Sequence, residues 1–115
     1  MKSKIIIYEN GTANVAGFAV YGSNRKETSY PLYDAELISI YVDIKHHRKG
    51  IGKKLFDHVI SDLANGGCKK MIIWCVKGNS NAQKFYEELG AVPFAEGELD
   101  FFGDTLIQIG YSYNL

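Results

Sequence analysis

The change from strand to helix that decides the fold lies in one stretch, Ile40-Tyr41-Val42-Asp43-Ile44-Lys45-His46-His47-Arg48-Lys49-Gly50-Ile51-Gly52-Lys53-Lys54-Leu55. A strand ends at Val42, a short basic turn follows, and two glycines one residue apart open a helix. Glycine at a helix N-terminus lets the backbone approach a ligand closely. The free N–H groups and the positive end of the helix dipole then favour a phosphate. The stretch therefore predicts a phosphate-binding turn between a strand and a helix.

Two familiar phosphate motifs do not fit this stretch. A P-loop needs four residues between its first glycine and Gly-Lys, whereas one residue separates Gly50 from Gly52. A dinucleotide-binding fingerprint needs a third glycine near Leu55 and an acidic residue at the end of a following parallel strand. The sequence has neither. A G-x-G pattern taken alone is as often a packing or turn feature as a ligand site.

Periodicity on either side of this stretch predicts the remaining elements. Strand patterns cover residues 5–8, 15–21, 36–42, 71–76, 99–102 and 105–113. A helix pattern begins at Ile51 and ends at Asn65-Gly66-Gly67, and a second runs from a capping box of Ser80 with Gln83 to Gly90. Residues 23–34 are polar and long enough to be a mobile loop. The order β-β-β-α-β-α-β-β predicts an α/β (α+β) fold, with a mixed, mostly antiparallel sheet, a central parallel crossover and helices packed on it.

Length and composition bound the function. A chain of 115 residues is enough for one compact domain, residues 1–115, and too short for two. Thirteen basic side chains balance thirteen acidic ones, which disfavours a nucleic-acid binder. The longest apolar runs are far shorter than a membrane span, and the N-terminus does not read as a signal peptide. Cys68 and Cys75 form no C-x-x-C motif, so a reduced cytoplasmic protein is expected.

The run from Ala35 to Phe94 resembles the GNAT superfamily of N-acetyltransferases. The acetyl-CoA motif of that family, [Gln/Arg]-x-x-Gly-x-[Gly/Ala], is matched by residues 47–52, with His47 in the place of Gln or Arg. The second signature, Asn-x-x-Ala-x-x-Phe-Tyr-x-x-x-Gly, is matched in full by residues 79–90. Two motifs in this order are far more specific than either alone. The chain resembles a minimal form that lacks the usual N-terminal strand and helices, which shape the acceptor site in the family.

The resemblance implies acetyl-CoA as the acyl donor and assigns residues to it. Backbone N–H groups from Arg48 to Lys53 would hold the pyrophosphate. The strand ending at Ile40-Tyr41-Val42 would splay from the next strand to admit pantetheine, and the Ile40 N–H would polarise the thioester carbonyl. Asn79 would bond the cofactor or simply cap its helix. The expected cofactor-binding residues are Ile40, Tyr41, Val42, His47, Arg48, Lys49, Gly50, Ile51, Gly52, Lys53, Asn79, Ala82 and Phe85.

Two side chains are candidates for catalysis. Glu36 resembles the general base of the family, which takes the proton of the acceptor ammonium directly or through water, and Asp34 is a weaker competitor. Equally, Glu36 could be a strand-end carboxylate that faces solvent. Tyr86 resembles the phenol that protonates or hydrogen-bonds the departing CoA sulfur, and it also fits a core stripe. The reaction implied is direct acetyl transfer to a primary amine of a small molecule or peptide.

Other functions remain open at this point. A non-catalytic acyl-CoA-binding or interaction module is the main alternative, because the usual N-terminal elements are missing. Metal binding by the adjacent His46 and His47 is disfavoured, since neighbours in sequence point apart and no further ligand stands at a suitable spacing. A cysteine nucleophile is disfavoured because no positioned base accompanies either cysteine. The uncovered first hairpin predicts a homodimer that covers its edge strand and apolar face.

Overall fold

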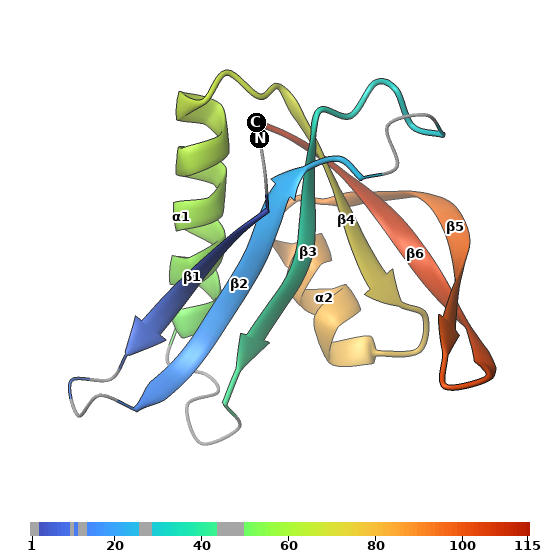
Figure 1. Ribbon diagram of the computed structural model, residues 1–115, viewed down its shortest axis with the longest axis horizontal. Coiled ribbons are helices and arrows are strands. Elements are labelled where there is room, and N and C mark those ends of the chain that lie inside the picture. Colours follow the sequence, from blue (N-terminus) through green and yellow to red (C-terminus); the bar gives the residue numbers. More distant parts are fainter. Residues whose placement is uncertain (1–2, 10, 12–13, 26–28, 44–49) are drawn as a thin grey trace.

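The computed structural model describes residues 3–9, 11, 14–25, 29–43 and 50–115. These ranges contain six strands and two helices (Figure 1). The elements are β1 (Lys4–Glu9), β2 (Val15–Ser23), β3 (Ala35–Val42), α1 (Ile51–Asn65), β4 (Lys70–Val76), α2 (Ser80–Glu88), β5 (Val92–Phe101) and β6 (Asp104–Asn114). The sheet order is β1-β2-β3-β4-β6-β5. Every strand pair in the sheet is antiparallel except β3 with β4. The predicted order and the parallel crossover are confirmed.

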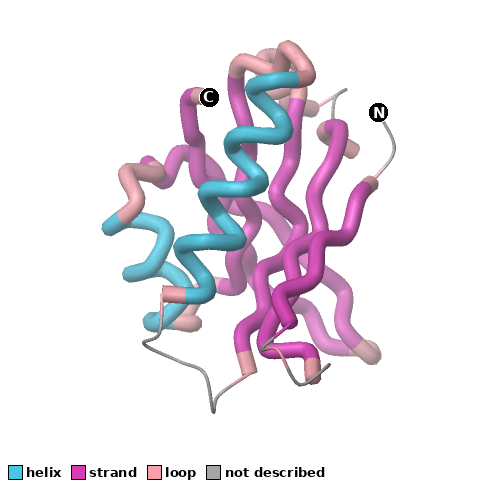
Figure 2. Tube along the Cα trace, turned by 90° about the vertical axis from the view of Figure 1, so that its left-hand side faces the viewer, coloured by secondary structure: helices cyan, strands magenta, loops and turns pink. Residues whose placement is uncertain are grey.

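Both helices cover the same face of the sheet (Figure 2). Helix α1 buries the residues whose spacing predicted it, Ile51, Leu55, Phe56, Val59 and Leu63. Together with the inward-facing residues of the strands and with Tyr86 of α2, they form the main core. The apolar strand β4 supplies Met71, Ile73 and Cys75 to this core. The side chains between them in sequence, Ile72 and Trp74, therefore point to the opposite face, because successive strand residues alternate.

A second, smaller cluster lies on the opposite face of the sheet. Tyr33, Ile72 and Trp74 are buried there, with Tyr30 packed against them. The indole of Trp74 lies over the glycines Gly97 and Gly110, where an added Cβ would come within 3.3 Å and 3.1 Å of the ring. Tyr30 and Tyr33 belong to the segment predicted as a mobile polar loop. These two tyrosines instead pack in this cluster, because their rings find buried partners on β4.

Two local predictions are wrong. The strand predicted over residues 99–102 is the end of β5, which begins at Val92. Its exposed glutamates hid the pattern, since β5 is an edge strand that pairs only with β6. The second helix begins at Ser80, the residue predicted to cap it, so its cap lies one residue earlier. Asn79 is the N-cap and accepts from the Ala82 N–H at 3.3 Å, while the Gln83 side chain accepts from the Gly78 N–H at 2.8 Å.

Candidate functional site

Strands β3 and β4 separate halfway along β3. Their parallel pairing joins only Ala35, Glu36 and Leu37 to Met71, Ile72 and Ile73. Beyond that point Leu37 and Ser39 of β3 face adjacent residues of β2, so Ile38 is an extra residue, a β-bulge. The bulge bends β3 and shifts its alternation by one residue. The two strands therefore diverge toward the end of the sheet near the start of α1 (Figure 1).

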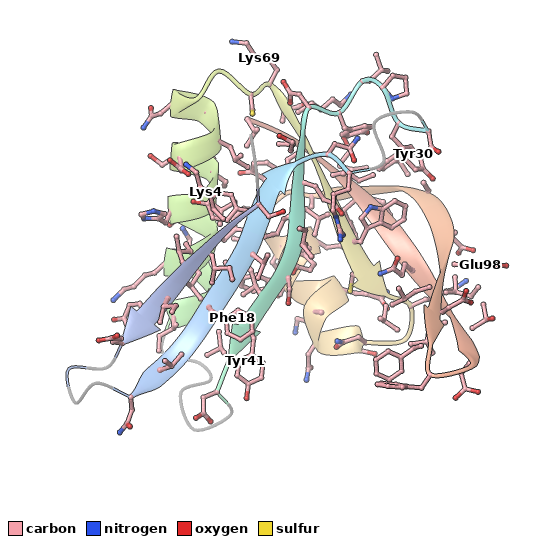
Figure 3. All side chains as sticks on the ribbon, in the orientation of Figure 1. Lys4, Phe18, Tyr30, Tyr41, Lys69 and Glu98 are labelled. Carbon is pink, nitrogen blue, oxygen red and sulfur yellow. The ribbon has the colours of Figure 1, made fainter. Side chains whose placement is uncertain are left out.

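The bulge decides which side chains of β3 face the helices. Ala35 and Leu37 belong to the main core before it, and Ile40 and Val42 pack against that core after it. Tyr41 then lies on the opposite face, where it is 53% exposed and stacks on Phe18 at a centroid distance of 5.5 Å (Figure 3). The expected cofactor strand is thus apolar toward the helices and aromatic on the other side.

Helix α1 starts beside this diverging strand. Gly50 is its N-cap, with φ 76, a left-handed conformation that glycine adopts without strain. No side chain caps the described N-terminus and no acidic residue lies in the first turn. The N–H groups at such an end have no partner within the helix and favour an anion. Gly17 of β2 permits the close packing here, because a Cβ on it would lie 2.7 Å from the Tyr41 carbonyl oxygen.

Part of the expected phosphate-binding turn lies outside the described residues. This part contains His47, Arg48 and Lys49, together with Lys45 and His46. Of the basic side chains in the described remainder, Lys53 pairs with Asp57 at 2.9 Å, and Lys54 Nζ lies 3.5 Å from the Tyr8 hydroxyl. These contacts leave the backbone of Gly50, Ile51, Gly52 and Lys53 as the described part of the predicted anion site.

Residues of the second signature pack α2 against α1. Phe85 contacts the ring of Phe56 on α1 edge to face, at a centroid distance of 6.3 Å. Ala82 and Phe85 both pack against the main core. The N-cap bond of Asn79 confirms the capping alternative for this residue.

Tyr86 is buried inside the aromatic part of the main core. Its ring lies 6.5 Å from that of Phe56 and 6.1 Å from that of Tyr111. Burial, with a smaller contribution from the nearby Cys75, raises the pKa of Tyr86 well above its ordinary value. The phenol therefore keeps its proton at neutral pH, as a hydrogen-bond donor to a leaving sulfur must. Burial and a 2.7 Å bond to Glu87 likewise raise the pKa of Tyr111 to about 12.

Glu36 lies on the face of the sheet opposite Tyr86. Its side chain is 0% exposed, so the alternative of a solvent-facing strand-end carboxylate is wrong. Arg25 covers it, with Nη2 2.9 Å from Oε2 and Nε 3.0 Å from Oε1. Arg25 is the described polar partner that the sequence did not indicate. It stands in a polar segment without periodicity, and only the burial of Glu36 reveals the need for a cation there. Asp34, the weaker candidate, is exposed and accepts from the backbone N–H groups of Lys69 and Lys70.

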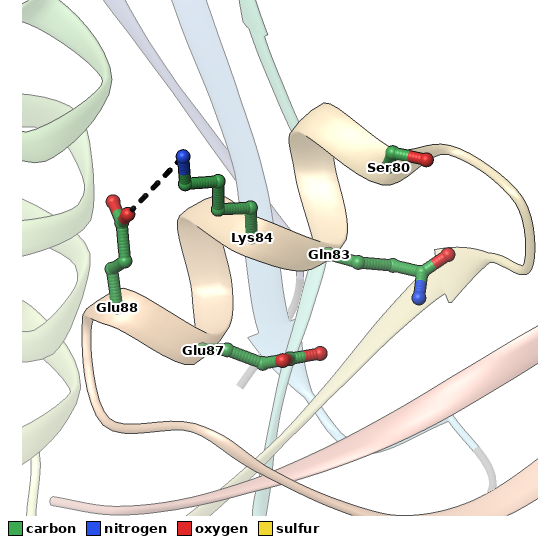
Figure 4. A pocket seen from close by; sticks show the side chains of 5 residues that line it. All are labelled: Ser80, Gln83, Lys84, Glu87 and Glu88. Atoms are coloured by element: carbon green, nitrogen blue, oxygen red, sulfur yellow. Dashed lines mark ion pairs between the residues drawn. The ribbon is translucent and has the colours of Figure 1, made fainter.

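A shallow hollow of about 450 Å³ lies on the outer surface of α2 (Figure 4). It is lined by Ser80, Gln83, Lys84, Glu87 and Glu88. At 3.6 residues per turn these positions lie on the side of α2 opposite Ala82, Phe85 and Tyr86. The hollow is therefore separate from the expected site. The described ranges contain no group of three or more histidine, cysteine, aspartate or glutamate side chains placed to hold a metal ion, and no helix in them is long and apolar enough to cross a membrane.

Comparison with known proteins gives consistent matches. Spermine/spermidine N(1)-acetyltransferase of Bacillus subtilis is 29% identical over 102 residues, which cover 82% of this chain and 62% of that protein. The enzyme of Escherichia coli that acetylates an alanine of ribosomal protein bS18 is 32% identical over 82 residues, covering 71% of this chain and 49% of that protein. This chain thus spans half to three fifths of the length of these relatives.

Solved structures share the fold. An IAA acetyltransferase from Bacillus cereus superposes with a TM-score of 0.76 at 21% identity, covering 96% of this chain and 77% of the other. A Salmonella typhimurium protein assigned to the acetyltransferases, and solved with its cofactor acetyl-CoA, gives 0.75 at 22% identity over 96% and 63% of the two chains. The sequence profile of the Acetyltransferase (GNAT) family matches residues 2–91. Since this match covers most of the chain, the protein belongs to the GNAT acetyltransferase family.

Proposed function

We propose that this protein is an acetyl-CoA-dependent N-acetyltransferase that moves an acetyl group directly to a primary amine. The observation that carries the proposal is the divergence of β3 from β4 after Leu37 and Ile73, beside the uncapped start of α1. A helix end that favours an anion lies beside a place where two central strands diverge. This arrangement suits a long thioester with a pyrophosphate at one end. Family membership supports the same reading.

Acetyl-CoA would supply the activated acyl group, and the chain's own residues would bind and orient it. The N–H groups of Gly50 to Lys53, with those of His47, Arg48 and Lys49 before them, are proposed to hold the pyrophosphate. Backbone groups of Ile40 to Val42 would run along pantetheine, and the Ile40 N–H would donate to the thioester carbonyl oxygen. Asn79, Ala82 and Phe85 would hold α2 against this arrangement.

The two catalytic candidates suit different reacting groups, the leaving sulfur and the attacking amine. Tyr86 stands on the helix side of the sheet, and Glu36 stands on the other side. An amine that approaches from the Glu36 face would attack the acetyl carbon between the diverging strands. The bond from carbon to sulfur breaks, and the phenol of Tyr86 gives a proton to the leaving sulfur. The ammonium proton passes to Glu36, directly or through water, before the amine attacks. The second nitrogen proton is lost as the amide forms and restores the Tyr86 phenol, so the net products are the amide, CoA thiol and the one proton that Glu36 returns to water.

The acceptor class follows from this arrangement and from the relatives. The relative in Bacillus subtilis is a spermine/spermidine acetyltransferase, and the one in Escherichia coli acts on an alanine of a ribosomal protein. Both kinds of acceptor present an amine, small or peptidic, and Glu36 is suited to receive its proton. We infer a cytoplasmic enzyme without metal, nucleic acid or membrane as partners. We also propose that it is a homodimer, because Ile5 and Ile7 are 66% and 57% exposed on the edge strand β1.

The test is acetyl-CoA turnover, followed as CoA release, against a panel that contains spermidine and a peptide with an N-terminal alanine. Turnover with an amine, absent in its omission control, supports the enzyme. CoA binding by calorimetry without turnover on any amine would instead favour the non-catalytic binding module. Absence of both would contradict the cofactor site itself.

A further inference from the structure

The contact between Arg25 and Glu36 is unusually complete for a residue outside any helix or strand. Three N–H groups of Arg25 donate to the carboxylate: the backbone N–H and Nε to Oε1, each at 3.0 Å, and Nη2 to Oε2 at 2.9 Å. The guanidinium side chain is itself 59% exposed, whereas Glu36 is fully buried. One exposed arginine thus holds both oxygens of a buried carboxylate from the solvent side.

A buried carboxylate is costly unless a charge and hydrogen bonds compensate it. The neighbours of Glu36 across the sheet are Gly22 on β2 and Ile72 on β4, and neither carries a charge. Among the described residues that bond to its carboxylate, Arg25 supplies the positive charge. The bond to Glu36 also raises the pKa of Arg25, so the guanidinium stays charged at neutral pH.

Other titratable groups lie on this face of the sheet. Tyr30 and Tyr33 belong to the cluster around Ile72, and Lys70 Nζ lies 5.2 Å from the centre of the Tyr33 ring. Asp34 binds the N–H groups at the start of β4. These groups have ring or backbone partners of their own, whereas Arg25 gives the Glu36 carboxylate the charge-assisted bonds described above.

We propose that Arg25 is a positioning residue for the acetyl transfer: it keeps Glu36 ionised and fixes the direction of its carboxylate, so that the base is ready at neutral pH. The inference rests on the proposed function, in which Glu36 accepts the proton of the acceptor ammonium and returns it to water. Arg25 neither gains nor loses a proton in this cycle. Its side chain acts only through its charge and the two bonds that Nε and Nη2 give to Glu36.

The experiment compares the pH dependence of kcat/KM for wild type, Arg25→Gln, Arg25→Lys and Glu36→Gln, with one amine that the enzyme accepts. A nearby opposite charge shifts carboxyl titration by about one to three pH units. We expect the acid limb of the Arg25→Gln profile to move upward by about that amount, so that kcat/KM falls most at pH values below the new limb. Arg25→Lys keeps the charge and loses the fork geometry, so its limb should move less. Lys4→Gln removes an exposed ion pair of 3.0 Å and is the matched control, with the wild-type limb expected.

The outcomes separate this inference from the proposed function. If Glu36→Gln loses the acid limb while Arg25→Gln keeps the wild-type limb, Glu36 is the base and the role of Arg25 is wrong. If Arg25→Gln instead lowers the KM for a cationic amine at every pH, Arg25 competes with the acceptor, which also overturns the inference. If Glu36→Gln keeps the wild-type profile, the proposed base is wrong. Arg25→Lys, with thermal unfolding measured beside it, covers the case in which the glutamine variant fails to fold.

Discussion

The ring of Phe85 occupies the space that a side chain on Gly52 would need. An added Cβ at Gly52 would lie 3.3 Å from both Cε1 and Cζ of this ring, and 3.7 Å from a methyl of Val42. The second glycine of the first signature and the phenylalanine of the second are thus in direct contact. The Cβ direction of Gly52 points at Phe85 of α2, so a side chain here would need the Phe85 ring to shift by about a few tenths of an ångström.

This contact predicts a specific coupling. Gly52→Ala should lower the free energy of unfolding by about 1–3 kcal/mol, because the added methyl crowds the Phe85 ring where α1 packs against α2. In the background of Phe85→Leu, where the ring is gone, the same methyl should cost much less. Urea unfolding of the two single variants and the double variant measures the interaction energy directly.

The same set of variants tests the cofactor site by calorimetry with CoA. Because the Cβ of Gly52 points at Phe85, we expect the double variant to bind CoA as tightly as Phe85→Leu alone. Gly11→Ala is a control for general effects of replacing glycine. An alanine at position 11 would be strained by the left-handed backbone conformation, but its Cβ would meet no neighbouring atom within 4 Å. Weak CoA binding that persists in the double variant would show instead that the methyl obstructs the ligand.

Much of the fold could be predicted because the side chains that become buried recur at the regular spacing of a helix or strand. Ile51, Leu55, Val59 and Leu63 predicted the buried face of α1 correctly, and the continuous apolar run of β4 predicted a strand covered on both faces. Edge strand β5 was shortened because exposed glutamates interrupt its pattern. The start of α2 was misplaced by one residue because both Asn79 and Ser80 are good caps.

The site was predictable to the extent that it lies on motif residues. Gly50, Gly52 and Phe85 were identified because they match the two signatures of the family that the sequence resembles. The bulge at Ile38 left no signal, because a bulge depends on which neighbour the strand pairs with and not on its own alternation. Arg25 was missed for a similar reason: its partner is eleven residues away, and a charge in a polar segment looks solvated until Glu36 is known to be buried.

A hydrogen bond between Tyr21 and Asp62 predicts how stability depends on pH. The buried Tyr21 hydroxyl donates to Asp62 at 2.7 Å, and Lys4 Nζ lies 3.0 Å from the same oxygen. The Tyr21 bond, followed by that from Lys4, lowers the pKa of Asp62. A carboxyl with a lowered folded pKa stabilises the fold above its unfolded pKa, and this stability is lost as pH falls through the folded value.

Tyr21→Phe should therefore cost about 1–2 kcal/mol in free energy of unfolding at pH 7, the usual contribution of a hydrogen bond to a charged group. The difference from wild type should begin to shrink below about pH 4, the pKa of aspartate in the unfolded chain, and should go on shrinking as pH falls through the lowered pKa of folded Asp62. Denaturant unfolding at several pH values measures it. Tyr8→Phe removes a hydroxyl that makes only a long contact, of 3.5 Å, and should change little. A Tyr21→Phe deficit that is constant with pH would contradict the role of Asp62.

The exposed isoleucines of β1 predict the assembly state. At high micromolar concentration we expect the mass of a dimer by light scattering, because an apolar edge strand is a surface that proteins normally cover. Ile5→Lys with Ile7→Lys should give a folded monomer, since both side chains point outward. Leu32→Lys, at a residue that is also exposed but lies away from β1, should leave the mass unchanged. A monomeric wild type would remove the argument.

Replacing Tyr86 distinguishes most clearly between an enzyme and a non-catalytic binding module. Tyr86→Phe keeps the ring among Phe56 and Tyr111 and removes only the hydroxyl. If the phenol donates to the departing sulfur in the transition state, kcat should fall about 10- to 100-fold, near or below the low end for general acids because a thiol leaves readily. CoA affinity should stay within about twofold of wild type, since the lost bond forms only as the sulfur leaves. Tyr113→Phe is the matched control, because its ring also packs on Phe56, at 5.2 Å, without a proposed role. Wild-type kcat in Tyr86→Phe would assign the tyrosine to the core alone, whereas a fall in kcat and CoA affinity together would assign it to binding of the cofactor.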